Sequence, residues 1–410
     1  RTGRVDSGDG GSWKAADEVR PVPAVINRLP IVRAVRYGTI AVLLAIAVAL
    51  PYILPVDRSL KSSAVLIYAL LGLSVVVVTG WAGQVSLGQV ALFAVGAAVG
   101  AKATSAWDQD LLVALLLGGA AAAVVAVVVG APALRLRGLE LAVITLATAI
   151  AITSWLLNDR FFAWVPNGRR VERPDLFGRF DITSATAIHH LSLGLLILGV
   201  VVLRGVRQSR TGRALLATRD NERGAQAYGI APLKLRLTAF ALSGAVAGVA
   251  GAMFAHHQQA FGTQPFQPGE NLKVFTMVVL GGIGSPMGAV LGAVWLQGIA
   301  WLLPGEWQLL ATGAGVLFIL LILPSGLGGL VLRLRNMWLG RVATRAGLDV
   351  PGFTAPTTAL PDGPAPAPFG PPDPAFADAA DAEPPDEGGG GPSPTPNRTA
   401  APETSEEVLR

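Results

Sequence analysis

The stretch LLVALLLGGAAAAVVAVVVGA at residues 111–131 runs for 21 residues without a charged side chain. A helix needs about 20 mostly apolar residues to cross the hydrocarbon core of a bilayer. Similar apolar runs, separated by short polar breaks, recur from Tyr37 to Leu332. The sequence therefore predicts an all-α, polytopic membrane helix bundle.

The apolar runs predict about ten spans. We place them near 38–54, 62–80, 84–101, 110–131, 139–157, 187–203, 237–255, 271–284, 287–303 and 308–331. The crossings at 271–284 and 287–303 would have to turn at GGIGSPMG, which carries no charged anchor. A re-entrant half-helix is the alternative there, and it would change the parity of the topology.

The composition limits what the protein can be. Of its 410 residues 52% are hydrophobic and 14% are charged, with a mean hydropathy of +0.53, which is too apolar for a water-soluble domain. The chain has no cysteine, which excludes disulfides and cysteine nucleophiles. Its basic pI of about 9.9 reflects Lys and Arg flanking the spans, so nucleic acid is not an expected partner.

Charge and composition also predict the domain organisation. We expect a polar cytoplasmic segment at 1–35, the membrane domain at 36–335, and a disordered, acidic Pro/Ala-rich cytoplasmic tail at 336–410. Residues 349–410 hold eleven acidic residues and two arginines, with too little apolar surface to offset the entropy of ordering. With the N-terminus inside, 23 of the 32 Lys and Arg residues fall on the inner side, which favours cytoplasmic placement of both termini.

A first glycine-rich motif is GWAGQVSLGQVALFAVGAAVGA at 80–101. Gly96 and Gly100 form a GxxxG pair, and Gly244 and Gly248 form another, so close helix packing explains part of the pattern. The polar start of the motif fits equally well a broken span that lines a wet path, and both interpretations stay open. The pathway candidates in this motif are Gly80, Gly83, Gln84, Ser86, Gly88 and Gln89.

A second glycine-rich motif is MVVLGGIGSPMGAVLGA at 277–293. Glycine and proline together predict an interruption of the helix before Gly288. Close helix packing explains most of the glycines in this motif. The functional hypothesis is that the interruption is a kink at a gate. The gate candidates are Gly281, Gly282, Gly284, Ser285 and Gly288.

The charged segment RQSRTGRALLATRDNERGAQAYGIAPLKLR at 207–236 predicts a short helix within the cytoplasmic loop 204–236. Ser209 or Thr211 can cap a helix that begins near Gly212, and Gly229 with Pro232 ends it. An ordinary solvated loop would need neither a defined helix nor its apolar residues. A docking element for a cytoplasmic partner is therefore the favoured interpretation.

In order and spacing these motifs, together with LRLRGLELAVITLA at 134–147 and LPSGLGGL at 323–330, resemble LivM-type permeases of branched-chain amino acid ABC importers. The resemblance covers most of residues 36–335. It implies a bacterial inner-membrane protein that works with a second, LivH-type permease, two cytoplasmic ATPases and an extracytoplasmic solute-binding protein. It adds Thr145 to the pathway candidates. The residues it implies for coupling to the ATPase are Gly212, Arg213, Arg219, Asp220, Glu222, Tyr228 and Gly229.

Several other function classes fit the sequence less well. The chain contains no Gly-Lys dipeptide and hence no loop of the form GxxxxGK[ST], so ATP and Mg²⁺ are expected on partner ATPases, with no cofactor or metal in this chain. No predicted span carries an ionisable group near its middle, which counts against an ion-coupled carrier. No nucleophile, metal or acid–base cluster suggests an enzyme. We therefore expect a permease subunit for branched-chain amino acids or related small polar solutes, with an ion-coupled secondary transporter or a channel as the alternative.

Overall fold

The computed structural model describes residue 26 and residues 29–346, except 137, 167, 169, 175–178, 180, 303–306, 308–312, 315, 318–320 and 324. Most of the segment 1–35, and the tail from 347 onward, therefore lie outside the described residues. Ten of the 24 residues of the expected span at 308–331 also lie outside them.

The described part of the chain is helical, with one isolated β-bridge between Arg170 and Ala260 and no β-strand. This confirms the all-α prediction. The helices are α2 (Pro30–Ile53), α3 (Val56–Val75), the π-helix η1 (Val76–Trp81), α4 (Gln89–Trp107), α5 (Leu111–Ala133), α6 (Leu139–Ala151), the π-helix η2 (Ile152–Leu156), α7 (Ala185–Gln208), α8 (Arg210–Asp220), α9 (Glu222–Ala227), α10 (Pro232–Gln258), the 3₁₀ turn η3 (Gln264–Phe266), α11 (Pro268–Gly281), α12 (Pro286–Leu302) and α14 (Gly326–Arg345).

Seven described helices are long and apolar enough to cross a membrane, and they correspond to the first seven expected spans. The third begins later than expected, at Gln89 rather than 84, because residues 82–88 are not helical. The expected spans at 271–284 and 287–303 are α11 and α12, which are bent by 119° across a break of four residues. That bend is typical of a broken or re-entrant span rather than of two separate crossings.

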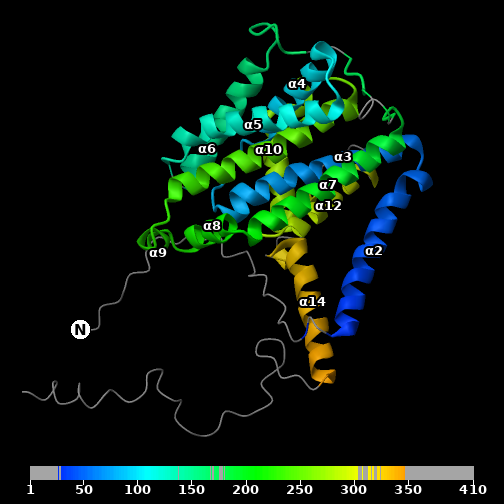
Figure 1. The fold of residues 1–410 in the computed structure, drawn as a ribbon, viewed down its shortest axis with the longest axis vertical. Helices are drawn as coiled ribbons and strands as arrows, with labels where there is room; N and C mark the ends of the chain where they lie inside the picture. The colour runs from blue at the N-terminus through cyan, green and yellow to red at the C-terminus, as the bar shows by residue number, and fades with distance from the viewer. Residues whose placement is uncertain are drawn as a thin grey trace, which may run out of the picture. The chain divides into compact units, whose positions relative to one another are not determined.

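The core of the bundle is built on α3, α4, α5 and α10 (Figure 1). In an 18-residue apolar stretch of the continuous helix α3–η1 83% of the residues are buried, against 6% for α2, which runs along the outside of the bundle. Helices α4, α5 and α10 approach one another through glycines. A Cβ at Gly96 would overlap the backbone of Gly248, and one at Gly251 would overlap the carbonyl of Phe93. The close packing expected of the GxxxG pairs is therefore present.

Helix α14 crosses the boundary that the sequence places at residue 336. It continues to Arg345, and Leu339 and Ala343 are buried against Ile26 and Val32 near the start of α2. The last ten residues of this helix were expected in the disordered tail. They are ordered because they carry apolar side chains with a partner to pack on. The composition that predicted disorder was that of residues 349–410, which does not include them.

Residues 158–184 connect η2 to α7 and are fastened to the end of α10. The Arg173 guanidinium donates to the carbonyl oxygens of His256 and His257 and to that of Thr183, at 2.8–2.9 Å. Val171 N also donates to Gln259 O at 3.0 Å. Burial lowers the pKa of Arg173 from its ordinary value. This connection holds the start of α7 and the end of α10 together at the end of the bundle opposite α8 and α9.

Candidate functional site

The segment from Ala82 to Gly88 interrupts the first glycine-rich motif. The preceding α3 widens into the π-helix η1 at Val76–Trp81, and Gly83 then takes a positive φ of +68°, which favours glycine. Gln84 stays near the turn, since its side chain donates to Ala82 O. The expected break is therefore present, but it follows Gly80 and Trp81 instead of including them.

Side chains from two other helices bind the end of the break at Leu87 and the first turn of α4 at Val90. Thr145 Oγ1 of α6 accepts from Leu87 N at 3.0 Å, and Asn271 Oδ1 of α11 accepts from Val90 N at 2.9 Å. Both side chains are buried. Because the first backbone N–H groups of a helix have no partner within it, these contacts tie the break to α6 and α11.

Gln89, which the sequence suggested as a pathway residue, is buried between helices. It is 3% exposed, and its Oε1 accepts from Ser74 Oγ at 3.2 Å and from Ser243 Oγ at 3.0 Å. Its Nε2 lies 3.5 Å from Ser86 Oγ. Gln89 thus joins α3, α4 and α10 in a buried polar cluster, where each polar group has a partner.

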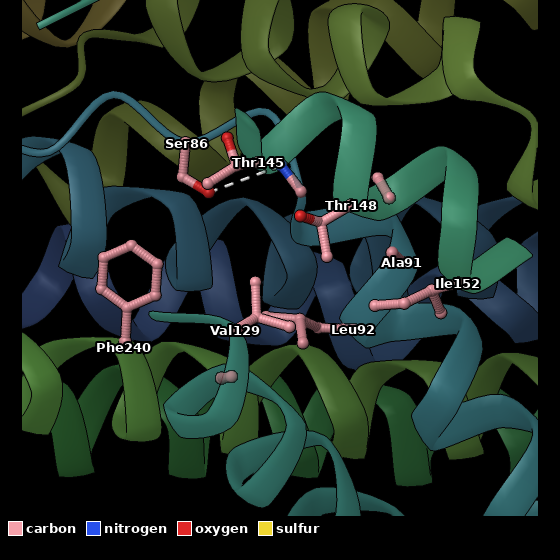
Figure 2. A pocket seen from close by; sticks show the side chains of 11 residues that line it. Ser86, Ala91, Leu92, Val129, Thr145, Thr148, Ile152 and Phe240 are labelled. Carbon is pink, nitrogen blue, oxygen red and sulfur yellow. Dashed lines mark hydrogen bonds between the residues drawn. The ribbon is translucent and has the colours of Figure 1, made fainter. Parts of the chain in front are cut away.

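A small pocket lies beside the break (Figure 2). Ser86 and Gly88 from the break and Thr145 and Thr148 from α6 form its polar side, and Phe240 of α10 forms part of its apolar side. The pocket leaves only ≈ 20 Å³ for the centres of water molecules. That is room for about one water molecule, so the pocket is closed to an amino acid in this conformation.

The charged segment 207–236 is named the coupling segment here for its expected role. Arg219 of α8 reaches from this segment to the break. Its Nη1 donates to Gly80 O at 2.7 Å, while its Nε and Nη2 each lie 2.8 Å from Asp220 Oδ1. A Cβ at Gly83 would lie 2.7 Å from Arg219 Cγ, so glycine leaves room for this side chain. Arg219 was expected at the contact with an ATPase, and Gly80 and Gly83 were expected along a solute path. The structure brings these candidates into direct contact.

The second glycine-rich motif meets the same point. Residues 282–285 separate α11 from α12, and Gly282 has a φ of +105°. A Cβ at Gly80 would overlap Ile283 O and come within 3.5 Å of the Cα of Gly284. Gly281 packs on the backbone of Gly288, and Ser285 Oγ accepts from Gly288 N at 3.4 Å. Gly80 therefore lies between Arg219 and the α11–α12 break.

The coupling segment itself is two helices rather than one. Asn221 ends α8 and caps α9, where its Oδ1 accepts from Gly224 N at 2.8 Å. The cap of α8 is Ser209, one of the two residues expected for that role. Asparagine favours this break because its amide competes with the helical hydrogen bonds of the backbone.

The other coupling candidates divide into buried and exposed groups. Gly212 is buried against the backbone of Val206 and Arg207. Glu222 pairs with Arg236 at 2.9 Å and so fastens α9 to the start of α10. Arg213, Asp220 and Gly229 are exposed, and Tyr228 is the most exposed large hydrophobic side chain of the described residues, at 90%.

Sequence reasoning missed several residues of this site. Ser74, Ser243, Asn271 and Arg236 carry hydrogen bonds that hold the break and the coupling segment in place. Asn271 had a detectable signal, since it is a lone amide at the start of an apolar run. The two serines had none, because small hydroxyl residues are common in packed membrane helices.

The sequence of this chain was compared with those of known proteins and matches one family. Residues 62–330 match the family described as branched-chain amino acid transport system / permease component. The chain is 30% identical over 310 residues to the high-affinity branched-chain amino acid transport system permease protein LivM of Escherichia coli and, equally, to that of Salmonella typhimurium; each match covers 70% of this chain and 73% of the relative.

Two other relatives match shorter parts. The Escherichia coli permease protein LivH is 29% identical over 203 residues, 45% of this chain and 64% of LivH. The autoinducer 2 import system permease protein LsrC of Yersinia pestis is 39% identical over 113 residues, 26% of this chain and 31% of LsrC. No solved structure matches. The chain therefore belongs to the family of permease components of branched-chain amino acid transport systems.

Proposed function

We propose that this chain is the membrane-spanning subunit through which an ABC importer moves branched-chain amino acids, or related small polar solutes, across the bacterial inner membrane. Its expected partners are a LivH-type second permease, two cytoplasmic ATPases that bind ATP and Mg²⁺, and an extracytoplasmic solute-binding protein. The α8–α9 end then faces the cytoplasm, with both termini on that side.

The contact of Arg219 with Gly80 carries this proposal. An ATPase that pushes on α8 would act through one charge-assisted hydrogen bond on η1, and through Gly80 on the α11–α12 break. Movement of η1 would also displace the break at Ser86 and Gly88, beside the closed pocket. Such a chain of packed contacts can convert ATP-driven closure of a motor into opening of a path.

The ion-coupled alternative has less support. Among the described residues, the buried polar side chains are serines, threonines, two histidines, one glutamine and one asparagine, with no buried carboxylate, lysine or arginine. A carrier usually holds its coupling ion on such a charged group inside the bundle. The contacts of α8 with η1 favour an external motor.

Reconstitution tests the proposed function directly. The complete complex in liposomes should accumulate leucine only when ATP inside and the binding protein outside are both present. Removal of either should reduce uptake to the rate of empty liposomes. Leucine uptake driven by a proton or sodium gradient without ATP would contradict the proposal and favour the secondary transporter.

Tyr228 is expected to contact the ATPase. Its 90% exposed ring follows α9 directly, and a large apolar ring left in water at a loop is typical of the centre of a binding interface. Tyr228→Asp should reduce the amount of ATPase that co-purifies with the permease by about tenfold, since buried aromatic anchors contribute roughly 1–2 kcal/mol or more to binding.

The matched control is Tyr37→Asp on α2, where the ring is 63% exposed but lies on another helix. It should leave co-purification of the ATPase unchanged. Equal recovery of ATPase with both variants would remove Tyr228 from the docking surface.

A further inference from the structure

A second, larger pocket lies at the end of the bundle opposite α8 and α9. It is formed by η2 and the residues after it on one side, and by the connection from α10 to α11 on the other. It leaves ≈ 340 Å³ for the centres of water molecules, within the range of small-molecule binding sites. Its lining residues are Thr153, Ser154, Asn158, Asp159, Thr263, Phe266, Gln267 and Pro268.

The lining combines three kinds of group. Asp159 offers a carboxylate, and no ion pair joins it to a cation among the described residues. Ser154, Thr263 and Gln267 offer hydroxyl and amide donors. Phe266 is 2% exposed and gives the pocket a fixed apolar wall, held by ring contacts to Phe93, Phe254 and Phe261.

Helix α6 and its extension η2 connect this pocket with the closed pocket beside the break. Thr145, Thr148 and Ile152 line the closed pocket, and Thr153 and Ser154, the next residues along the same helix, line the larger one. The junction between them is the π-helix η2, which ends this helix at Leu156. A solute in the larger pocket would therefore lie at the outer end of the path that leads to Ser86.

We propose that the larger pocket is an outer binding site for a zwitterionic amino acid. The carboxylate of Asp159 pairs with the solute ammonium group, the hydroxyl of Thr263 and the amide of Gln267 bind its carboxylate, and Phe266 contacts its apolar side chain. The inference rests on the proposed function, because it assumes that the chain transports amino acids. It goes further by locating where the solute first binds this subunit.

The absence of native cysteine makes a direct test possible. In the complete complex, a Ser154→Cys variant is labelled with a small thiol reagent, without binding protein, at increasing leucine concentrations. Leucine should slow the labelling at least about tenfold at saturation, since a bound solute excludes the reagent. The matched control is Ser105→Cys on the exposed end of α4, which lies outside the pocket and should be labelled at one rate throughout.

Two comparisons test the chemistry of the site. The leucine analogue 4-methylpentanoate lacks the ammonium group and should give no protection. Adding Asp159→Asn to the Ser154→Cys variant should raise the leucine concentration needed for protection at least about tenfold, the scale of one lost charge-assisted contact. Asp108→Asn, a carboxylate outside the pocket, should leave that concentration unchanged.

The outcomes separate this inference from the proposed function. If the wild-type complex takes up leucine but leucine protects neither cysteine, the outer site is wrong and the transport function stands. Equal protection by leucine and 4-methylpentanoate would overturn the role of Asp159. Absence of wild-type leucine uptake would overturn the assignment of branched-chain amino acids as the solute, on which the inference rests.

Discussion

Arg219→Ala should leave the complex assembled and hydrolysing ATP, while ATP-driven uptake falls at least about tenfold. The guanidinium carries the hydrogen bond at 2.7 Å that links α8 to Gly80 O. Hydrogen bonds to charged groups contribute roughly 1.5–3 kcal/mol, and the partial exposure of this side chain places the expected effect near the lower end. Without the bond, movement of α8 no longer pulls on η1, so hydrolysis and transport separate.

Three measurements distinguish coupling from a merely structural role. Arg219→Lys keeps the positive charge and one donor, so it should restore part of the uptake. Arg58→Ala, an exposed arginine at the start of α3, should behave like wild type. Loss of ATPase co-purification in Arg219→Ala would instead make Arg219 a docking residue, and normal uptake would remove it from the mechanism.

Gly251→Ala should destabilise the bundle by about 2 kcal/mol or more, the usual scale of overpacking a tightly packed core. A Cβ there would overlap the carbonyl of Phe93, which belongs to the backbone of α4 and cannot rotate away. Helices α4 and α10 would have to separate along a seam that also includes Gly96 and Gly248. The expected result is a lower midpoint of thermal unfolding of the detergent-solubilised permease.

Gly194→Ala on α7 is the matched control. A Cβ at Gly194 would meet nothing within 4 Å, so only the better helix propensity of alanine remains, worth up to about 1 kcal/mol. The midpoint should stay the same or rise. Equal midpoints for Gly251→Ala and Gly194→Ala would show that the α4–α10 seam yields more easily than its backbone contacts imply.

The local features of the sequence predicted the helices well. Apolar runs such as 111–131 located the first seven spans because hydropathy depends only on the residues of one segment. The cap at Ser209 followed from the same local chemistry. The sequence did not predict that the coupling segment divides into two helices at Asn221. The residues around Asn221 are compatible with one continuous helix, and a single asparagine is a weak signal of a break.

The site was predicted only in part. Glycines at 80, 83, 281 and 288 indicated interruptions, and each lies at or next to one. Their partners could not be inferred, because Val90 and Asn271, or Gly80 and Arg219, are 181 and 139 residues apart in the chain. The sequence placed Gln89 on a path, while the structure buries it between Ser74 and Ser243.

The sequence by itself determined a membrane bundle with broken, glycine-rich spans and one charged helical segment between two spans, since hydropathy, helix breaking and capping are local properties. Only the tertiary structure decided that both breaks and the charged segment meet at Gly80. The physical reason is that such contacts depend on how helices distant in the chain pack. A serine, glutamine or glycine in a membrane segment shows that the helix surface carries a polar group or a gap there. It does not show which neighbouring helix lies opposite that position.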